Sequence, residues 1–266
     1  MKNLRVLKSG FDMKRISVLV LMVTLLIIST GHTKECFIVK EKDKLVKKEG
    51  ECQTAFAPHS TFKIPLSLMG FDSGILMNEN APSFPFTDEN TFLNICKSAH
   101  DPKTWMRDSC VWFSQVLTKK LGMKKFQEYV TKFEYGNRDV SGGLEKSWLS
   151  SSLKITADEQ IQFIQKMIDY KLPINSKAVD KTKSILFIQE LPGGWKLYGK
   201  TGNGSNHKRI QQGWFVGWIE KENRKLVFVQ HIADEKVEKT YASFRSKNEA
   251  TTKLWYLIND LAGHVP

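Results

Sequence analysis

Hydrophobic side chains recur at intervals of three and four residues through the middle of the chain, which is the spacing that places them on one face of a helix. Four segments show this pattern and are predicted helices: residues 61–72, 104–122, 123–133 and 156–170. Thr156 and Glu159 form a capping box at the start of the last segment, which supports a helix beginning there.

After residue 194 the apolar residues alternate with polar ones, which predicts strands. Three strands are expected there, at residues 194–202, 213–221 and 225–233, and an amphipathic helix is expected at 246–261. Residues 36–39 ("CFIV") form a strand-like piece near the other end of the sequence.

Strands at both ends and helices between them predict an α+β architecture with one domain over residues 32–266. We expect an α/β lobe from residues 32–60 and 190–266, whose antiparallel sheet uses both ends of the chain. A helical lobe of residues 61–189 would be inserted into it. A cleft between two such lobes is a common place for a small-molecule site.

Residues 1–31 resemble a secretory signal peptide, because five Lys or Arg residues precede the apolar run "ISVLVLMVTLLII" and small polar residues follow it. A membrane anchor is the alternative, but about 13 residues is short of the roughly 20 that span a bilayer. Met13 is a second possible start. We therefore expect an exported, periplasmic protein that leaves the membrane after cleavage.

The net charge of +12 falls to +8 when the predicted leader is set aside. Lys and Arg are spread along the chain and often stand beside Glu, as in "KEKDKLVKKEGE", without the aromatic and basic signature of a nucleic-acid module. A solvated basic surface is favoured, and no nucleic-acid partner is expected.

The sequence has four cysteines but no CxxC motif. It has six histidines but neither an HExxH motif nor a close histidine cluster, so a metal site is not supported. Cys36 and Cys52 flank a possible pair of strands joined by a polar turn. Export would permit a disulfide between them, and two buried free thiols are the alternative.

Serine followed three residues later by lysine occurs three times, so the motif alone carries little information. The pairs are Ser60/Lys63, Ser151/Lys154 and Ser205/Lys208. Ser205/Lys208 lies in a hydrophilic segment, and Ser151/Lys154 opens no helix of its own. Only Ser60 stands at the start of an apolar helix, where backbone N–H groups are free to stabilise an oxyanion.

Lys63 would lie one helical turn from Ser60 and on the same face. Burial among apolar neighbours such as Phe62 and Leu66 would disfavour the charged form of its amine and make it a base for a serine nucleophile. The alternative is a helix-capping serine followed by a lysine whose ammonium reaches solvent.

Further motifs stand in a fixed order along the chain: Ser60-Thr61-Phe62-Lys63, Ser109-Cys110-Val111, Tyr135-Gly136-Asn137 and Lys200-Thr201-Gly202. With Trp148 in "KSWLSSSLKIT" and Arg245 in "YASFRSKNEA", the sequence resembles the class D, oxacillinase-type serine β-lactamases over nearly all of residues 32–266. The resemblance implies the fold shared with penicillin-binding transpeptidases, in which an antiparallel sheet is flanked by N- and C-terminal helices.

The resemblance also implies roles for individual residues. Ser60 is the nucleophile, and Lys63, carboxylated by carbon dioxide on its amine, is the general base. Ser109, placed by its pattern in the middle of a helix, is a proton relay. Val111 and Trp148 surround the carbamate, and the N–H groups of Ser60 and Asn203 form the oxyanion hole. Lys200 is also counted among the catalytic residues, and with Thr201 and Arg245 it is implied to bind the substrate carboxylate. Gly202 and Asn203 complete the implied substrate-binding set.

The expected partner is a small β-lactam, with no metal and no cofactor besides carbon dioxide, in a monomer or homodimer. A β-lactam sensor domain would share these motifs but normally follows several membrane helices, and a penicillin-binding transpeptidase usually has Ser-x-Asn where this chain has Ser109-Cys110-Val111. The sequence does not fix the drug spectrum.

Overall fold

A computed structural model of the chain describes residues 34–86, 91 and 93–263, with side chains described as far as residue 260. The predicted leader (1–31), its cleavage site and the N-terminal helix expected beside the sheet lie outside the described residues. Thr33–Pro266 forms one compact unit. None of the helices in the described ranges has the length and apolar character needed to cross a bilayer.

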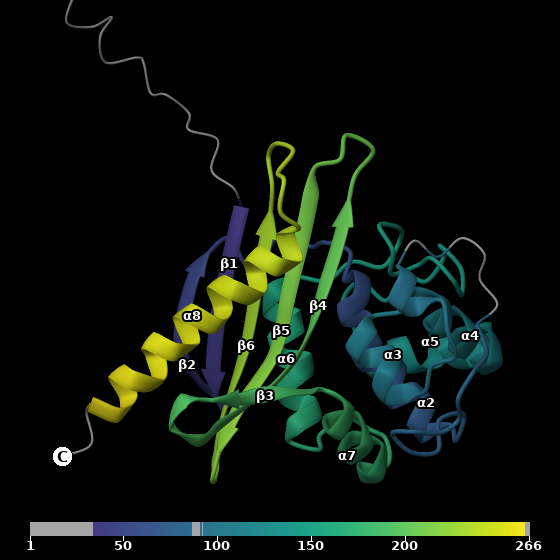
Figure 1. Cartoon of the computed structure of the whole chain (residues 1–266), viewed down its shortest axis with the longest axis horizontal. Coiled ribbons are helices and arrows are strands. Elements are labelled where there is room, and N and C mark those ends of the chain that lie inside the picture. Colours follow the sequence, from purple (N-terminus) through teal and green to yellow (C-terminus); the bar gives the residue numbers. More distant parts are fainter. Residues whose placement is uncertain (1–33, 87–90, 92, 264–266) are drawn as a thin grey trace, which may run out of the picture. The chain divides into compact units, whose positions relative to one another are not determined.

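Six antiparallel strands make one sheet in the order β2-β1-β6-β5-β4-β3, which places the first strand, β1, beside the last, β6 (Figure 1). The strands are β1 (Lys34–Glu41), β2 (Lys44–Gly50), β3 (Phe187–Leu191), β4 (Trp195–Ser205), β5 (Gln211–Lys221) and β6 (Arg224–Ala233). The expectation of an antiparallel sheet built from both ends is therefore confirmed. The three C-terminal strands were predicted within a few residues, whereas β3 was missed.

Alternation of side chains along β5 divides the core between the two faces of the sheet. Phe215 and Ile219 belong to a core cluster with Leu254 of α8 (Ala242–Gly263), the helix that lies across one face in Figure 1. Trp214 and Trp218 belong to the larger cluster shared with α6 (Ala157–Ile168) and the other helices. β5 is buried on both faces, which is why it reads as a nearly continuous apolar run.

Between β2 and β3 the chain is mainly helical. The remaining helices are α2 (Lys63–Asp72), α3 (Pro102–Asp108), α4 (Val111–Leu121), α5 (Met123–Lys132) and α7 (Ser176–Ile185), with 3-10 turns η1 (His59–Phe62), η2 (Asn94–Cys96) and η3 (Pro192–Gly194). The capping box predicted at Thr156 and Glu159 is present at the start of α6. The sequence pattern did not predict α7.

The single helix predicted over residues 104–122 is wrong, because the chain breaks into α3 and α4 at Ser109 and Cys110. Ser109 adopts a left-handed backbone with φ 64°, which ends α3, and Cys110 is extended at the start of α4. Ser109 therefore lies at a junction between two helices and not in the middle of one.

The open question about Cys36 and Cys52 is answered by a disulfide that joins β1 to the segment just after β2, with the two Cα atoms 5.0 Å apart. A second disulfide, Cys96–Cys110, was not anticipated, and it ties η2 to the junction between α3 and α4. No cysteine is free among the described residues.

Candidate active site

The serine turn η1 leads directly into α2 and places Ser60 one turn before Lys63. The Thr61 hydroxyl and amide both donate to the Pro58 carbonyl, at 2.7 and 3.1 Å, which closes the turn. The Ser60 side chain does not cap α2, whose N-cap is Phe62. Instead, the Lys63 Nζ donates to the Ser60 Oγ at 3.2 Å, so the capping alternative does not describe this serine.

Lys63 is almost entirely buried, with 1% of its surface exposed. Burial removes solvation from the ammonium, and the nearby charge of Lys200 repels it, so the pKa of Lys63 lies well below its usual range. Its ammonium does not reach solvent, which excludes the second part of the capping alternative. A neutral amine beside a serine hydroxyl can accept a proton from it.

Trp148 forms one wall of this region. Its indole stacks on Phe62 with ring centroids 5.5 Å apart, and its carbonyl accepts a hydrogen bond from the His59 amide at 3.0 Å. The side chain is fully buried, yet its Nε1–H has no hydrogen-bond partner among the described residues. A buried donor without an acceptor is uncommon and marks a place where an acceptor would be stabilised.

The second half of β4 runs past the serine turn. β3 pairs with β4 only from Trp195 to Tyr198, and the part beyond Gly199 contacts η1. Gly202 makes this approach possible, because a Cβ at this position would lie 2.7 Å from the Pro58 carbonyl oxygen and 3.1 Å from the Thr61 nitrogen. Only glycine lets the strand and the serine turn come this close.

Lys200 is the second buried lysine of the site. Its Nζ donates to the Thr201 carbonyl at 3.1 Å, and the Thr201 hydroxyl lies 3.5 Å away. Burial, followed by the charge of Lys247, lowers the pKa of Lys200 to about 7. This lysine therefore changes its charge near neutral pH.

Asn203 near the end of β4 and Asp234 just after β6 both bind the start of α8. The Asn203 side-chain oxygen accepts from the Ser243 amide at 3.0 Å. The Arg245 guanidinium donates to the buried Asp234 carboxylate at 2.6 Å. The Arg245 Nε also donates to the Thr240 carbonyl at 3.4 Å, and about a quarter of the side chain stays exposed.

Ser109 and Val111 lie at the junction of α3 and α4. The Ser109 amide donates to the Trp105 carbonyl at 3.0 Å, and Val111 is the first residue of α4 and is half-buried. The side chain of Cys110 is buried within the second disulfide.

Tyr135 and Asn137 have supporting positions. Tyr135 packs edge-on against Phe62 with centroids 5.2 Å apart. The Asn137 side chain accepts from the Lys154 amide at 3.0 Å and donates to the Ser152 carbonyl at 2.9 Å. Their contacts hold neighbouring segments in place.

His59 was missed by the sequence analysis, although it directly precedes Ser60. Its backbone is left-handed with φ 48°, and a Cβ on Gly204 would collide with its ring. Gln212 of β5 lies 2.8 Å from its Nε2, and burial followed by the charge of Lys154 lowers its pKa to about 4. A neutral imidazole thus fills the space between the serine turn and the sheet. Its adjacency to Ser60 was the available signal.

The site thus combines a serine nucleophile, a buried amine beside it, an unpartnered indole N–H and a second buried lysine on a strand that approaches the serine turn. This arrangement is suited to acyl transfer with cationic recognition of the acyl donor.

Comparison with known proteins supports this chemistry. Residues 25–255 match the family model described as the penicillin binding protein transpeptidase domain. The chain is 39% identical over 234 residues to "Beta-lactamase OXA-1" of Escherichia coli, with 84% of each chain covered. It is 40% identical over 228 residues to "Beta-lactamase OXA-9" of Klebsiella pneumoniae, with 77% of this chain and 81% of that protein covered.

A solved structure of the class D β-lactamase OXA-427 superimposes with a TM-score of 0.80 at 39% identity. The superposition covers 85% of this chain and 99% of that one.

Proposed function

The chain belongs to the class D serine β-lactamases, which open the β-lactam amide through a serine acyl-enzyme, and we propose how its residues divide that work. Such hydrolysis confers resistance to β-lactam antibiotics. The proposed substrates are penicillins of the oxacillin type and some cephalosporins. The observation that carries the proposal is the 3.2 Å contact between the Nζ of the buried Lys63 and the Oγ of the half-buried Ser60.

Ser60 is the proposed nucleophile. Its Oγ would bond to the β-lactam carbonyl carbon as its proton leaves toward the Lys63 side chain, and the ring C–N bond would then break to give the acyl-enzyme. The backbone N–H groups of Ser60 and Asn203 are the proposed oxyanion hole. Ser109 is the proposed relay that returns a proton to the ring nitrogen. Water would then hydrolyse the Ser60 ester.

Lys63 is the proposed site of carboxylation. Carbon dioxide reacts only with a neutral amine, and the lowered pKa of Lys63 provides one. A carbamate needs hydrogen-bond donors, and the unpartnered Nε1–H of the buried Trp148 fits that need. Val111 would line the apolar side. When bound, the carbamate supplies a carboxylate base for acylation and deacylation, and the class needs no metal cofactor.

Lys200, Thr201 and Arg245 are the proposed partners of the carboxylate that penicillins and cephalosporins carry, with Gly202 keeping the strand close to the nucleophile. Lys200 and Arg245 offer cationic donors, and Thr201, the residue after Lys200, offers a hydroxyl donor. Arg245 would hold its salt bridge to Asp234 while its exposed part meets the substrate.

We further propose that the protein works in the periplasm after export, as a monomer or homodimer, on a small-molecule substrate and without a nucleic-acid partner. The charge is distributed along the chain, which disfavours a nucleic-acid site.

Turnover of a chromogenic cephalosporin, measured with and without bicarbonate while intact mass is followed, tests this proposal. Rapid turnover that bicarbonate increases is the expected result. A stable adduct on Ser60 with no turnover would contradict the proposal and assign the chain to a sensor or penicillin-binding role.

A further inference from the structure

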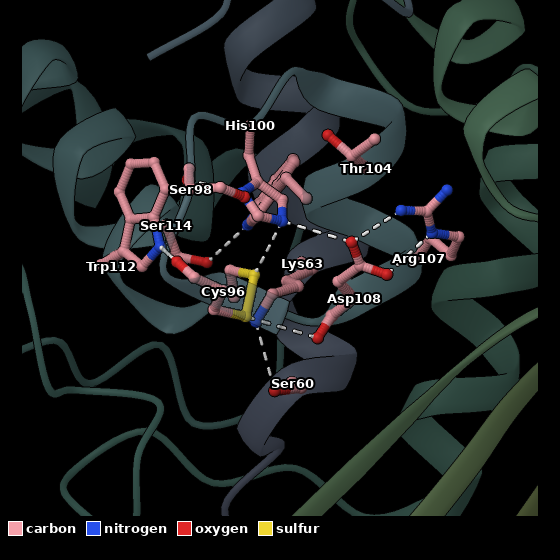
Figure 2. Close-up of a disulfide and its surroundings, with 12 residues drawn as sticks. Ser60, Lys63, Cys96, Ser98, His100, Thr104, Arg107, Asp108, Trp112 and Ser114 are labelled. Atoms are coloured by element: carbon pink, nitrogen blue, oxygen red, sulfur yellow. Dashed lines mark hydrogen bonds and ion pairs between the residues drawn. A yellow bond between two sulfur atoms is a disulfide. The ribbon is translucent and has the colours of Figure 1, made fainter. Parts of the chain in front are cut away.

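The second disulfide lies among side chains that commonly bind transition metals. His100 Nε2 is 3.3 Å from the Cys110 Sγ and 3.2 Å from the Asp108 Oδ2 (Figure 2). The donor atoms of Cys96, His100 and Cys110 all lie within 4.8 Å of one another. These distances place two sulfurs and one imidazole nitrogen around a common point, with a carboxylate oxygen of Asp108 beside the imidazole.

A backbone carbonyl fixes the orientation of His100. Its Nδ1 lies 2.9 Å from the Ser98 carbonyl oxygen, which can only accept, so Nδ1 carries a proton and donates. Nε2 is left to face the sulfur of Cys110. Metal-binding histidines are typically held in this way, with one ring nitrogen on a backbone carbonyl and the other on the metal.

The cluster is enclosed. Cys96, His100 and Cys110 each expose 2% of their surface or less, and the Asp108 side chain exposes 5%. Arg107 pairs with Asp108 from the solvent side at 2.7 and 2.8 Å. The edge of Trp112 also packs against His100, with ring centroids 5.9 Å apart. A buried set of two thiolates, one imidazole and one carboxylate suits Zn²⁺ and disfavours Mg²⁺ or Ca²⁺.

We propose that, when the Cys96–Cys110 disulfide is reduced, Cys96, Cys110 and His100 bind one Zn²⁺, with Asp108 as the fourth ligand. A dithiol would transfer two electrons and two protons to the disulfide, giving two thiols and the oxidised dithiol. Zn²⁺ would then bond to both sulfurs as their two protons leave to solvent. The Cα atoms of the two cysteines lie 5.5 Å apart, so the sulfurs separate by side-chain rotation.

The sequence did not indicate this site because its ligands are not arranged as a CxxC motif. The cysteines are 14 residues apart, and their approach depends on the break between α3 and α4. Two of the proposed ligands, Asp108 and Cys110, flank Ser109 directly. The metal would thus hold the Ser109 junction in the reduced protein as the disulfide holds it in the oxidised one.

Cobalt(II) binding tests this inference independently of β-lactamase activity. The Cys36→Ser/Cys52→Ser variant keeps Cys96 and Cys110 as its only cysteines. It is unfolded with a phosphine reductant and refolded with Co²⁺. We expect about one Co²⁺ per chain, with thiolate charge-transfer and tetrahedral absorption bands that Zn²⁺ removes. His100→Ala should weaken binding about tenfold or more.

The matched control is Cys96→Ser/Cys110→Ser, which keeps the other cysteine pair. In the described part of the chain, no His, Asp or Glu joins Cys36 and Cys52 in a comparable group. The control should therefore show no such bands. Absence of the bands in the reduced Cys36→Ser/Cys52→Ser protein, whether or not it refolds, or equal bands in the control, overturns the inference.

Discussion

Two segments of this chain carry the same Ser-x-x-Lys spacing and differ in almost every physical respect. Ser60 and Lys63 lie on a 3-10 turn and the helix that follows it, with the lysine fully buried and its Nζ on the serine oxygen. Ser205 and Lys208 lie at the exposed turn between β4 and β5, where water solvates both. The comparison teaches that spacing alone is not enough: the helical turn brings Ser60 and Lys63 together, and burial makes the lysine a base.

The largest effect should follow loss of the buried amine. Lys63→Ala should lower kcat for a chromogenic cephalosporin by about 10³-fold or more, because general-base catalysis typically contributes about 10² to 10⁴-fold. The matched Lys208→Ala change should stay within about twofold. Turnover with saturating bicarbonate and circular dichroism of both variants are the measurements. Full turnover by Lys63→Ala would contradict the claim that the buried lysine is the base.

A smaller loss is expected from Gly202→Ala. The new methyl group would meet the Pro58 carbonyl and push β4 away from the serine turn. A displacement near 1 Å at a catalytic site costs about 10²-fold in rate. Steady-state kcat/KM checks this, with thermal unfolding as the control for folding. Wild-type kcat/KM would show that the close approach is unnecessary.

Trp148→Phe tests whether the indole N–H binds the carbamate, because the substitution keeps an aromatic ring against Phe62 and removes the N–H donor. Hydrogen bonds to charged groups contribute about 1.5 to 3 kcal/mol, so we expect at least about tenfold more bicarbonate to be needed for half-maximal activity. A bicarbonate titration of the variant and the wild type gives the answer. Identical titration curves would remove Trp148 from the carbamate environment.

The smallest effect concerns Lys200, whose pKa is lowered to about 7 by burial. Below that pH the amine is charged and can bind the substrate carboxylate, and above it the charge is lost. kcat/KM should therefore fall as pH rises through about 7, by up to about tenfold per pH unit. Lys200→Arg, which keeps its charge, should flatten that descending limb. If the decrease in kcat/KM above about pH 7 is unchanged in Lys200→Arg, another group causes it.

Local patterns in the sequence predicted the local parts of the molecule. The capping box of Thr156 and Glu159 and the apolar run of β5 each depend on neighbours within one element. The pairing of Ser60 with Lys63 is of the same kind, because three residues on a helix fix it.

Long-range and strained features could not be predicted in this way. The break at Ser109 requires a left-handed backbone that the apolar spacing of residues 104–122 conceals. The approach of Gly202 to Pro58 joins segments 144 residues apart, and it becomes visible only when the sheet is assembled. The Cys96–Cys110 disulfide depends on that same break.

Carbon-13 NMR of the enzyme equilibrated with ¹³C-labelled bicarbonate tests the central claim, that burial turns Lys63 into a carboxylated base beside Ser60. We predict one carbamate resonance in the wild type, the same resonance in Lys208→Ala, and none in Lys63→Ala. Absence of the resonance in a wild-type sample that turns over substrate, or its persistence in Lys63→Ala, would contradict the account.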